Sequence, residues 1–84
     1  MKILITGSSG FIGYHLSLYL LKKKYIIIGI DNNNSYYDVN LKLERLKILK
    51  KYKKFKFYKI DISNKLKLFD VFKKEKISIV INLA

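Results

Sequence analysis

Four short apolar runs constrain the fold of this 84-residue chain more than any other feature. They cover residues 2–6, 25–30, 55–60 and 77–83, and they are rich in isoleucine, valine and aromatic residues. Near-continuous apolar runs of this kind are typical of parallel strands that are covered on both faces. The longer stretches between the runs are amphipathic, so the sequence predicts the order β-α-β-α-β-α-β.

The three amphipathic stretches predict helices over residues 11–23, 39–51 and 65–74. Asp38 and Ser63 are placed to cap the second and third helices, and lysines crowd the last turn of each helix, where the helix dipole favours positive charge. The residues expected to face the sheet are Ile12, Leu16 and Leu20, then Val39, Leu43 and Leu46, then Leu66, Phe69 and Phe72.

Right-handed crossovers between such strands give an α/β fold, the N-terminal part of a Rossmann doubly wound parallel sheet with strand order 3-2-1-4. The third strand is then an edge strand, and Lys56 and Lys59 on it discourage unwanted pairing. The fourth strand stays apolar up to Ala84, although this topology makes it central. We therefore expect residues 1–84 to be the N-terminal portion of one Rossmann domain, without the rest of the domain or a substrate-binding region.

Residues 6–13, with the sequence TGSSGFIG, connect the first predicted strand to the first predicted helix. Gly7 allows a tight turn, Gly10 allows a pyrophosphate to approach the backbone, and Gly13 allows the helix to pack closely on the sheet. The helix N-terminus then offers free N–H groups to phosphates. A flexible turn is the alternative for such a glycine pattern taken alone, but its position between strand and helix favours dinucleotide binding.

An acidic residue supports the same function. Asp31 follows the second predicted strand, 18 positions beyond Gly13, where a carboxylate accepts hydrogen bonds from the adenosine ribose. It would repel a 2′-phosphate, and residues 32–34 are all asparagine, with no cation to offset that charge. The sequence therefore predicts NAD rather than NADP.

Composition bears on the other classes of partner. The net charge is +12, but all the basic residues except Arg45 are lysine, which favours a compositional bias over nucleic-acid recognition. Residues 53–59 alternate lysine with aromatic residues, which an edge strand explains as well as a nucleic-acid platform does. Without cysteine or a long apolar run, we expect a cytoplasmic protein with no nucleic-acid or membrane partner.

The glycine segment resembles the extended short-chain dehydrogenase/reductase family, whose members open with T-G-x-x-G-F-I-G. Within it, residues 31–38 (DNNNSYYD), followed by Leu41-Lys42 and Arg45-Leu46, resemble the UDP-glucuronate 4-epimerases. The resemblance implies that Asp61 and Ile62 contact adenine and that residues 82–84 pass beside the cofactor. The cofactor-binding residues predicted in this way are Gly7, Gly10, Phe11, Ile12, Gly13, Asp31, Asn32, Asn34, Asp61, Ile62, Leu83 and Ala84.

Two residues depart from the family pattern. Asn82 stands where histidine is commoner, and Lys24 stands where a glycine usually closes the first helix. A lysine in a left-handed cap costs on the order of 1 kcal/mol. Tyr36 and Tyr37 either pack at the start of the second helix or lie near the cofactor, and we slightly favour the second interpretation.

The resemblance also implies an activity: oxidation of the sugar at C4 by NAD, followed by return of the hydride to the other face. The tyrosine and lysine of the family's Y-x-x-x-K pair come after the fourth strand, so we expect no catalytic residue and no activity in this chain alone. The parent would be an NAD-dependent epimerase, a homodimer acting on a nucleotide-sugar. The alternatives are another epimerase or dehydratase, or a non-catalytic module that binds dinucleotide or nucleic acid.

Other candidate residues have simpler explanations. The pairs Tyr19–Lys23 and Tyr52–Lys56 match Y-x-x-x-K but are predicted to lie far from the glycine segment, so we reject both. His15 is the only histidine, which leaves no basis for a triad or a metal cluster, and we expect it to be structural.

Overall fold

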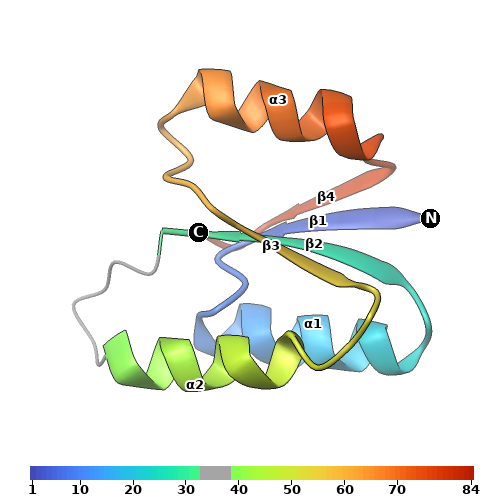
Figure 1. The fold of residues 1–84 in the computed structure, drawn as a ribbon, viewed down its shortest axis with the longest axis vertical. Helices are drawn as coiled ribbons and strands as arrows, with labels where there is room; N and C mark the ends of the chain where they lie inside the picture. The colour runs from blue at the N-terminus through green and yellow to red at the C-terminus, as the bar shows by residue number, and fades with distance from the viewer. Residues whose placement is uncertain (33–38) are drawn as a thin grey trace.

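A computed structural model describes residues 1–32 and 39–84 and shows three helices packed on a parallel sheet (Figure 1). The observed boundaries lie within two residues of the predicted ones. The elements are β1 (Lys2–Thr6), α1 (Phe11–Lys22), β2 (Ile26–Asp31), α2 (Val39–Leu49), β3 (Phe55–Lys59), α3 (Lys65–Glu75) and β4 (Ile79–Asn82).

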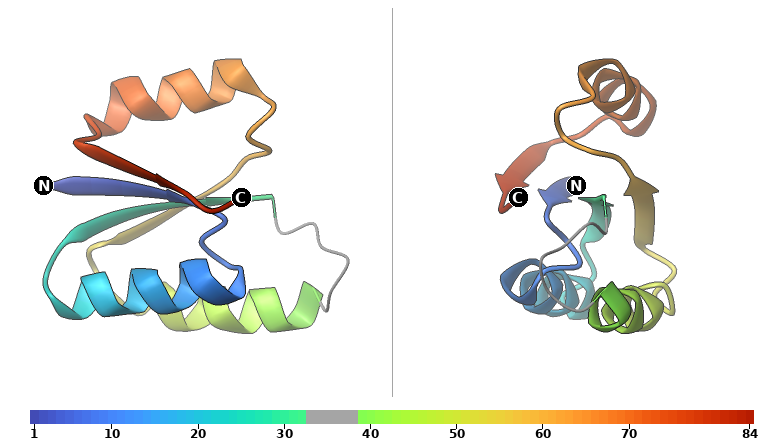
Figure 2. Two further views of the ribbon diagram at one scale, coloured as in Figure 1. Left: turned by 180° about the vertical axis from the view of Figure 1, so that it is seen from behind. Right: turned by 90° about the vertical axis from the view of Figure 1, so that its left-hand side faces the viewer.

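The four strands lie in the order β3-β2-β1-β4, and every pairing is parallel. Helices α1 and α2 cover one face of the sheet and α3 covers the other, as the end-on view in Figure 2 shows. This arrangement confirms the predicted fold class and strand order. Strand β3 is an edge strand, as Lys56 and Lys59 indicated, and β4 lies at the opposite edge of the four-stranded sheet.

Helix α1 does not face the sheet with the predicted stripe. Its buried residues are Gly13, Ser17 and Leu21, one position further along the chain, whereas Ile12 is 65% exposed. Two small residues in this row bring the helix backbone close to the strands, and the larger Leu16 and Leu20 pack only at its flanks. The prediction from apolar residues alone was wrong because close approach, rather than side-chain hydrophobicity, selects this face.

The predicted stripe of α3 was also wrong. Leu66 and Phe69 are 78% and 61% exposed, whereas Val71 and Glu75 are buried. Phe72 was predicted correctly, since it is partly buried against the core. The buried face therefore includes a carboxylate, which a search for apolar residues could not include. On α2 the prediction was correct for Leu46, which is buried, and wrong for Leu43, which is 47% exposed. Leu49 is buried in addition, and the predicted Val39 side chain lies outside what the structure describes.

Buried Glu75 joins α3 to the sheet through three donors. It accepts a hydrogen bond from the Tyr58 hydroxyl, and it forms ion pairs with Lys56 at 2.9 Å and Lys2 at 3.3 Å. The Tyr58 hydroxyl first, and then the lysines, lower the pKa of Glu75 to about 2. Lys56 on the edge strand is thus the partner of a buried carboxylate, in addition to protecting the edge.

The residues predicted at the helix ends have different outcomes. Asn64, not Ser63, caps α3, because the Asn64 side chain accepts from the Lys67 N–H, whereas Ser63 donates to Asp61. The proposed cap of α2, Asp38, lies outside the described residues. Lys24 has φ of 74°, which confirms the left-handed residue expected after α1.

Candidate functional site

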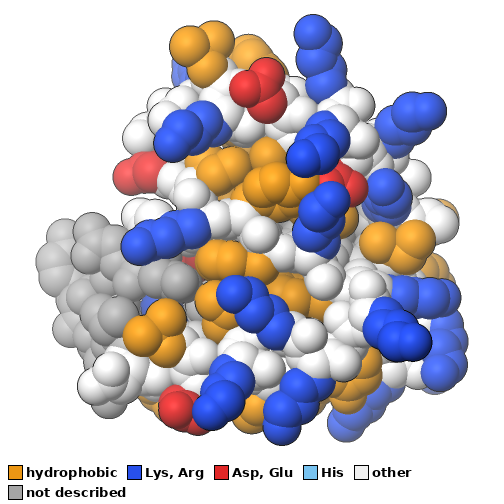
Figure 3. Space-filling view, in the orientation of Figure 1, with side chains coloured by type: hydrophobic (Ala, Val, Ile, Leu, Met, Phe, Trp, Pro, Cys, Tyr) orange, Lys and Arg blue, Asp and Glu red, His pale blue; other side chains and the backbone are white. Residues whose placement is uncertain are grey.

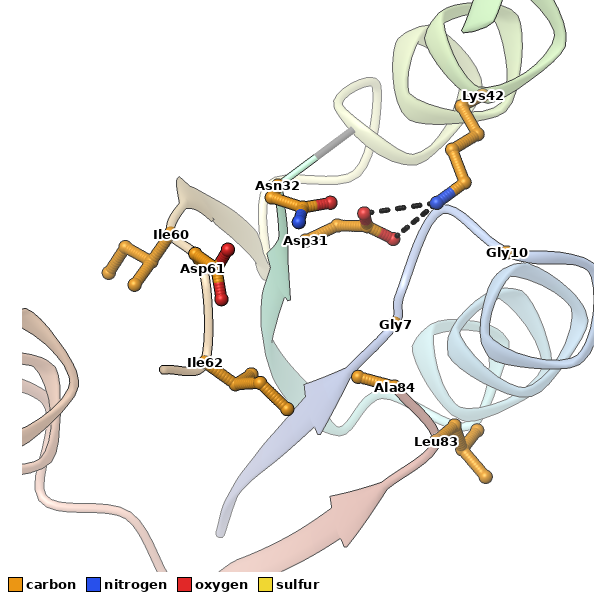
Figure 4. A pocket seen from close by; sticks show the side chains of 10 residues that line it. All are labelled: Gly7, Gly10, Asp31, Asn32, Lys42, Ile60, Asp61, Ile62, Leu83 and Ala84. Carbon is orange, nitrogen blue, oxygen red and sulfur yellow. Dashed lines mark hydrogen bonds and ion pairs between the residues drawn. The ribbon is translucent and has the colours of Figure 1, made fainter. Parts of the chain in front are cut away.

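A pocket of about 400 Å³ opens at the carboxyl ends of the strands, where parallel sheets place their ligand sites (Figure 4). Its size lies within the range of small-molecule sites. Five segments contribute to its lining: the glycine segment, the end of β2, α2, the loop after β3 and the residues after β4. The lining residues are Gly7, Gly10, Asp31, Asn32, Lys42, Ile60, Asp61, Ile62, Leu83 and Ala84.

The glycine segment has two positions where a side chain would be strained. Gly7 has φ of 71° and donates its N–H to the Ile30 carbonyl at 2.8 Å, which ties the turn to β2. A Cβ on Gly13 would lie 2.0 Å from the Gly7 oxygen, so a side chain there would collide with backbone. Gly10 is extended and leads directly into α1, whose first N–H groups have no partner within the helix. They provide donors for an anion at the mouth of the pocket.

Asp31 lies beside this segment and is buried. Its Oδ2 accepts the Ser9 N–H at 3.1 Å, and the Lys42 ammonium lies 3.2 Å from its Oδ1. Figure 4 shows the Lys42 side chain reaching from α2 across the top of the pocket toward this carboxylate. The premise that no cation offsets Asp31 was therefore wrong, because α2 supplies one that the neighbouring residues 32–34 do not.

The opposite wall of the pocket follows β3 and combines the apolar side chain of Ile62 with one carboxylate, whereas the Ile60 side chain points away from the pocket into the core (Figure 4). Ile60 and Ile62 flank Asp61, whose Oδ1 accepts from the Ser63 N–H at 2.9 Å and from the Ser63 hydroxyl at 2.8 Å. These hydrogen bonds lower the pKa of Asp61, with a smaller contribution from the Asn32 side chain. The arrangement presents an apolar surface and a fixed acceptor, which suits a flat heterocycle with an exocyclic amine.

The floor of the pocket is fastened by the side chain of Thr6. Its Oγ1 donates to Asn82 Oδ1 at 2.5 Å and accepts from the N–H groups of Leu83 at 3.0 Å and Ala84 at 3.3 Å. These hydrogen bonds hold the residues after β4 close to Gly7. A Cβ added to Gly7 would lie only 3.0 Å from the Ala84 nitrogen. The contact of Asn82, which the sequence left open, is thus with Thr6.

The structure gathers most of the predicted site residues in one place. Phe11 and Ile12 are 66% and 65% exposed at the start of α1, Gly13 packs beneath the turn, and none of these three predicted residues lines the pocket. Asn34 lies outside the described residues, as do Tyr36 and Tyr37. The predicted residues that line the pocket are Gly7, Gly10, Asp31, Asn32, Asp61, Ile62, Leu83 and Ala84.

The sequence analysis missed three contributors to this site. Lys42 and Ile60 line the pocket, and Thr6 fastens its floor. Arg45, three residues after Lys42, donates to the Ser9 carbonyl at 3.2 Å and supports the glycine segment from α2. The i, i+3 spacing of the two cations was the available signal, because it places both on one face of a helix near its start.

Residues set aside from the sequence lie elsewhere. The Lys23 ammonium sits over the Tyr19 ring at 5.6 Å near the end of α1, and neither residue lines the pocket. His15 is exposed and makes edge contacts with Phe11 and Tyr14.

The aromatic residues of β3 are used in packing. Phe55 is buried in the core beneath α1 and α2, and Tyr58 packs on the side of α3. They do not form an exposed stacking platform, which supports the edge-strand interpretation of residues 53–59. Basic side chains are spread over the face seen in Figure 3 rather than gathered at one place.

The described residues contain neither a candidate metal cluster nor a candidate membrane span. Within residues 1–32 and 39–84, no three His, Cys, Asp or Glu side chains are grouped so as to hold a metal ion. None of the helices in the described part of the chain is both long and apolar enough to cross a membrane.

Comparisons with known proteins agree with this geometry. The UDP-glucuronate 4-epimerase of Thermodesulfobacterium geofontis is 49% identical over 81 residues, which cover 96% of this chain and 25% of that protein. The Bacillus cereus UDP-glucuronic acid 4-epimerase, solved with UDP-glucuronic acid and NAD, superposes with a TM-score of 0.89 at 38% identity, covering 100% of this chain and 26% of that one. The Bacillus anthracis dTDP-glucose 4,6-dehydratase, solved with NAD, gives 0.86 at 30% identity, with coverages of 100% and 26%.

The family follows from these likenesses together with a direct family match. This chain spans about a quarter of the length of the relatives it matches. The sequence pattern of the GDP-mannose 4,6 dehydratase family matches residues 4–84, nearly the whole of the chain. The chain therefore belongs to that family, the NAD-dependent epimerases and dehydratases of the extended short-chain dehydrogenase/reductase type.

Proposed function

We propose that this chain binds the adenosine diphosphate half of NAD in an NAD-dependent nucleotide-sugar epimerase. Residues 1–84 would form the N-terminal portion of its Rossmann domain. The observation that carries the proposal is the packing of Gly13 on Gly7, which brings the N-terminus of α1 close to the turn, next to the Asp31 carboxylate that accepts the Ser9 N–H. A helix N-terminus suits a diphosphate and a carboxylate suits an adenosine ribose, so the nearness of the two supports the proposal.

Each part of the ADP moiety has a matching part of the pocket. The pyrophosphate would lie over Gly7 and Gly10, facing the N-terminus of α1, which is the positive end of the helix dipole. The ribose hydroxyls would donate to Asp31, and the adenine would rest against Ile62, with Asp61 as acceptor for its amine. Bound NAD supplies hydride acceptance and return. The residues of this chain bind and orient it, and we assign none of them a catalytic role.

The substrate is proposed to be UDP-glucuronate, epimerised at C4. Support comes from the likeness to the Thermodesulfobacterium and Bacillus cereus enzymes and from the run DNNNSYYD at residues 31–38. A 4,6-dehydratase acting on a related nucleotide-sugar is the second candidate, because the Bacillus anthracis enzyme has nearly the same fold over this chain.

Calorimetric titration of the purified chain tests the binding proposal. We expect NAD and ADP to bind and nicotinamide mononucleotide not to bind, because the pocket matches only the adenosine half. Salt-sensitive binding of a mixed oligonucleotide, with no response to NAD or ADP, would contradict the proposal.

The substrate proposal needs the protein encoded by the complete reading frame. We expect it to convert UDP-glucuronate to its C4 epimer, whereas residues 1–84 alone show no turnover. Release of a 4-keto-6-deoxy product from a nucleotide hexose would instead favour the dehydratase. Turnover by the 84-residue chain would contradict our assignment of catalysis to residues outside it.

A further inference from the structure

The Asp31–Lys42 ion pair raises the question of how the ribose subsite selects its ligand. The Lys42 ammonium lies 3.2 Å from Asp31 Oδ1 and 3.5 Å from Oδ2, so it spans both carboxylate oxygens. The two side chains are 15% and 4% exposed. The carboxylate is thus almost fully covered, and its charge is balanced by a cation that is itself largely withdrawn from water.

This balance changes the usual account of NAD selectivity. An isolated carboxylate at the ribose excludes NADP by repelling the 2′-phosphate, whereas a nearby cation accommodates that phosphate. In this chain the carboxylate of Asp31 and the ammonium of Lys42 lie together at the proposed ribose subsite. A second cation, Arg45, also faces this corner, where it donates to the Ser9 carbonyl at 3.2 Å. The nearest other described acid of the pocket, Asp61, lies on the opposite wall, where Ser63 engages it.

We propose that Lys42 is a specificity-determining residue whose affinity for phosphate is masked by Asp31. While the carboxylate is present, the ammonium is occupied by it, and the ribose hydroxyls of NAD find their acceptor. When the carboxylate is removed, the ammonium is left beside the 2′ position and binds the 2′-phosphate of NADP. Selectivity for NAD therefore resides in the pair, and one substitution converts the subsite. This inference rests on the proposed function, because it presumes that the adenosine ribose occupies this corner.

The test compares two probes that differ only in the 2′-phosphate: adenosine 5′-monophosphate and adenosine 2′,5′-bisphosphate. Their affinities are measured by calorimetry for the wild-type chain and for the variants Asp31→Asn, Lys42→Met and Asp31→Asn/Lys42→Met. Lys47→Met is the matched control, because Lys47 is an exposed lysine of the same helix that does not line the pocket. Circular dichroism establishes that each variant is folded.

Asp31→Asn should shift the affinity ratio toward the bisphosphate by about 10- to 100-fold, the range of a charge-assisted hydrogen bond. Lys42→Met in that background should abolish the shift, and Lys47→Met should leave the ratio unchanged. Lys42→Met alone should discriminate more strongly against the bisphosphate than the wild type does, since the Asp31 carboxylate then faces the 2′-phosphate without the Lys42 charge. If Asp31→Asn does not fold, the affinity ratio of Lys42→Met alone tests the role of Lys42.

Two failures are distinguishable. A wild-type chain that binds neither NAD nor adenosine 5′-monophosphate would contradict the proposed function itself. A wild type that binds both, with ratios unaffected by Lys42 in either background, would overturn the role of Lys42 and leave the cofactor assignment intact.

Discussion

Replacing Gly13 with alanine tests the geometry of the glycine segment, because two physical effects then have opposite signs. Gly13 is the third residue of α1, and alanine in a helix is favoured over glycine by about 1 kcal/mol. In this structure, however, the new Cβ would lie 2.0 Å from the Gly7 oxygen and 2.8 Å from the Gly7 carbonyl carbon. Both atoms are backbone, so no side-chain rotation relieves the collision, and α1 must move away from the turn.

Overpacking of a well-packed interior costs about 1–3 kcal/mol, and a backbone collision lies at the upper end of that range. We therefore expect Gly13→Ala to lower the free energy of unfolding by about 2 kcal/mol after the gain in helix propensity. NAD affinity should fall at least about tenfold, because the amides move away from the diphosphate. Urea denaturation followed by fluorescence of the tyrosines, together with calorimetric titration of NAD, measures both quantities.

Ser17→Ala is the matched control, one turn further along the same buried row. The Ser17 hydroxyl is buried and finds no hydrogen-bond partner among the described residues, so its removal should stabilise the fold by about 1 kcal/mol. If Gly13→Ala proved as stable as Ser17→Ala and bound NAD with wild-type affinity, the close packing of α1 on the turn would be refuted.

Four further outcomes are expected. Glu75 has a pKa of about 2 when folded against an ordinary value of 4.5, so its ionised form stabilises the fold above about pH 4.5, and this contribution is lost as the pH falls toward 2. Glu75→Gln should therefore cost about 1–3 kcal/mol at pH 7 and flatten the acid limb of stability measured by urea denaturation between these values; an unchanged acid limb would refute the role of the carboxylate. Lys24→Gly should raise the free energy of unfolding by about 1 kcal/mol, because the residue has φ of 74°, and a loss of stability would contradict the strain. Thr6→Val should weaken NAD binding more than Thr6→Ser does, since valine lacks the hydroxyl that bonds residues 82–84 whereas serine keeps it, and equal affinities in the two variants would remove the Thr6 hydroxyl from that role. The 84-residue chain should self-associate through β4, which is an edge strand with Val80 48% exposed and no charged side chain, and a monodisperse monomer in sedimentation velocity would argue against this.

The sheet could be predicted from the sequence because its determinants are local. Each strand is a short apolar run, the connections are helical, and parallel crossovers have one hand, which predicts a doubly wound sheet, and 3-2-1-4 is the usual strand order of that fold. The positions of Gly7, Gly10 and Asp31 could be predicted for the same reason, since each lies at a fixed offset from a strand end. In a parallel sheet the register of the strands decides which residues meet at their carboxyl ends.

The helix faces could not be predicted, because they depend on distances between elements. Ser17 and Glu75 occupy buried positions where a search for hydrophobic periodicity expects leucine or phenylalanine. Ser17 is small enough for close approach of α1, and Glu75 has three partners that are distant in sequence. Lys42 was missed for a related reason, since its pairing with Asp31 requires knowing that α2 begins above the carboxyl end of β2.

A crystal structure of the chain with NAD tests the central claim most directly. Our account predicts the diphosphate against the amides of the segment from Gly7 to Gly13, with a ribose hydroxyl within hydrogen-bonding distance of the Asp31 carboxylate. Dinucleotide bound at another surface, or a ribose that makes no contact with Asp31 at full occupancy, would contradict it.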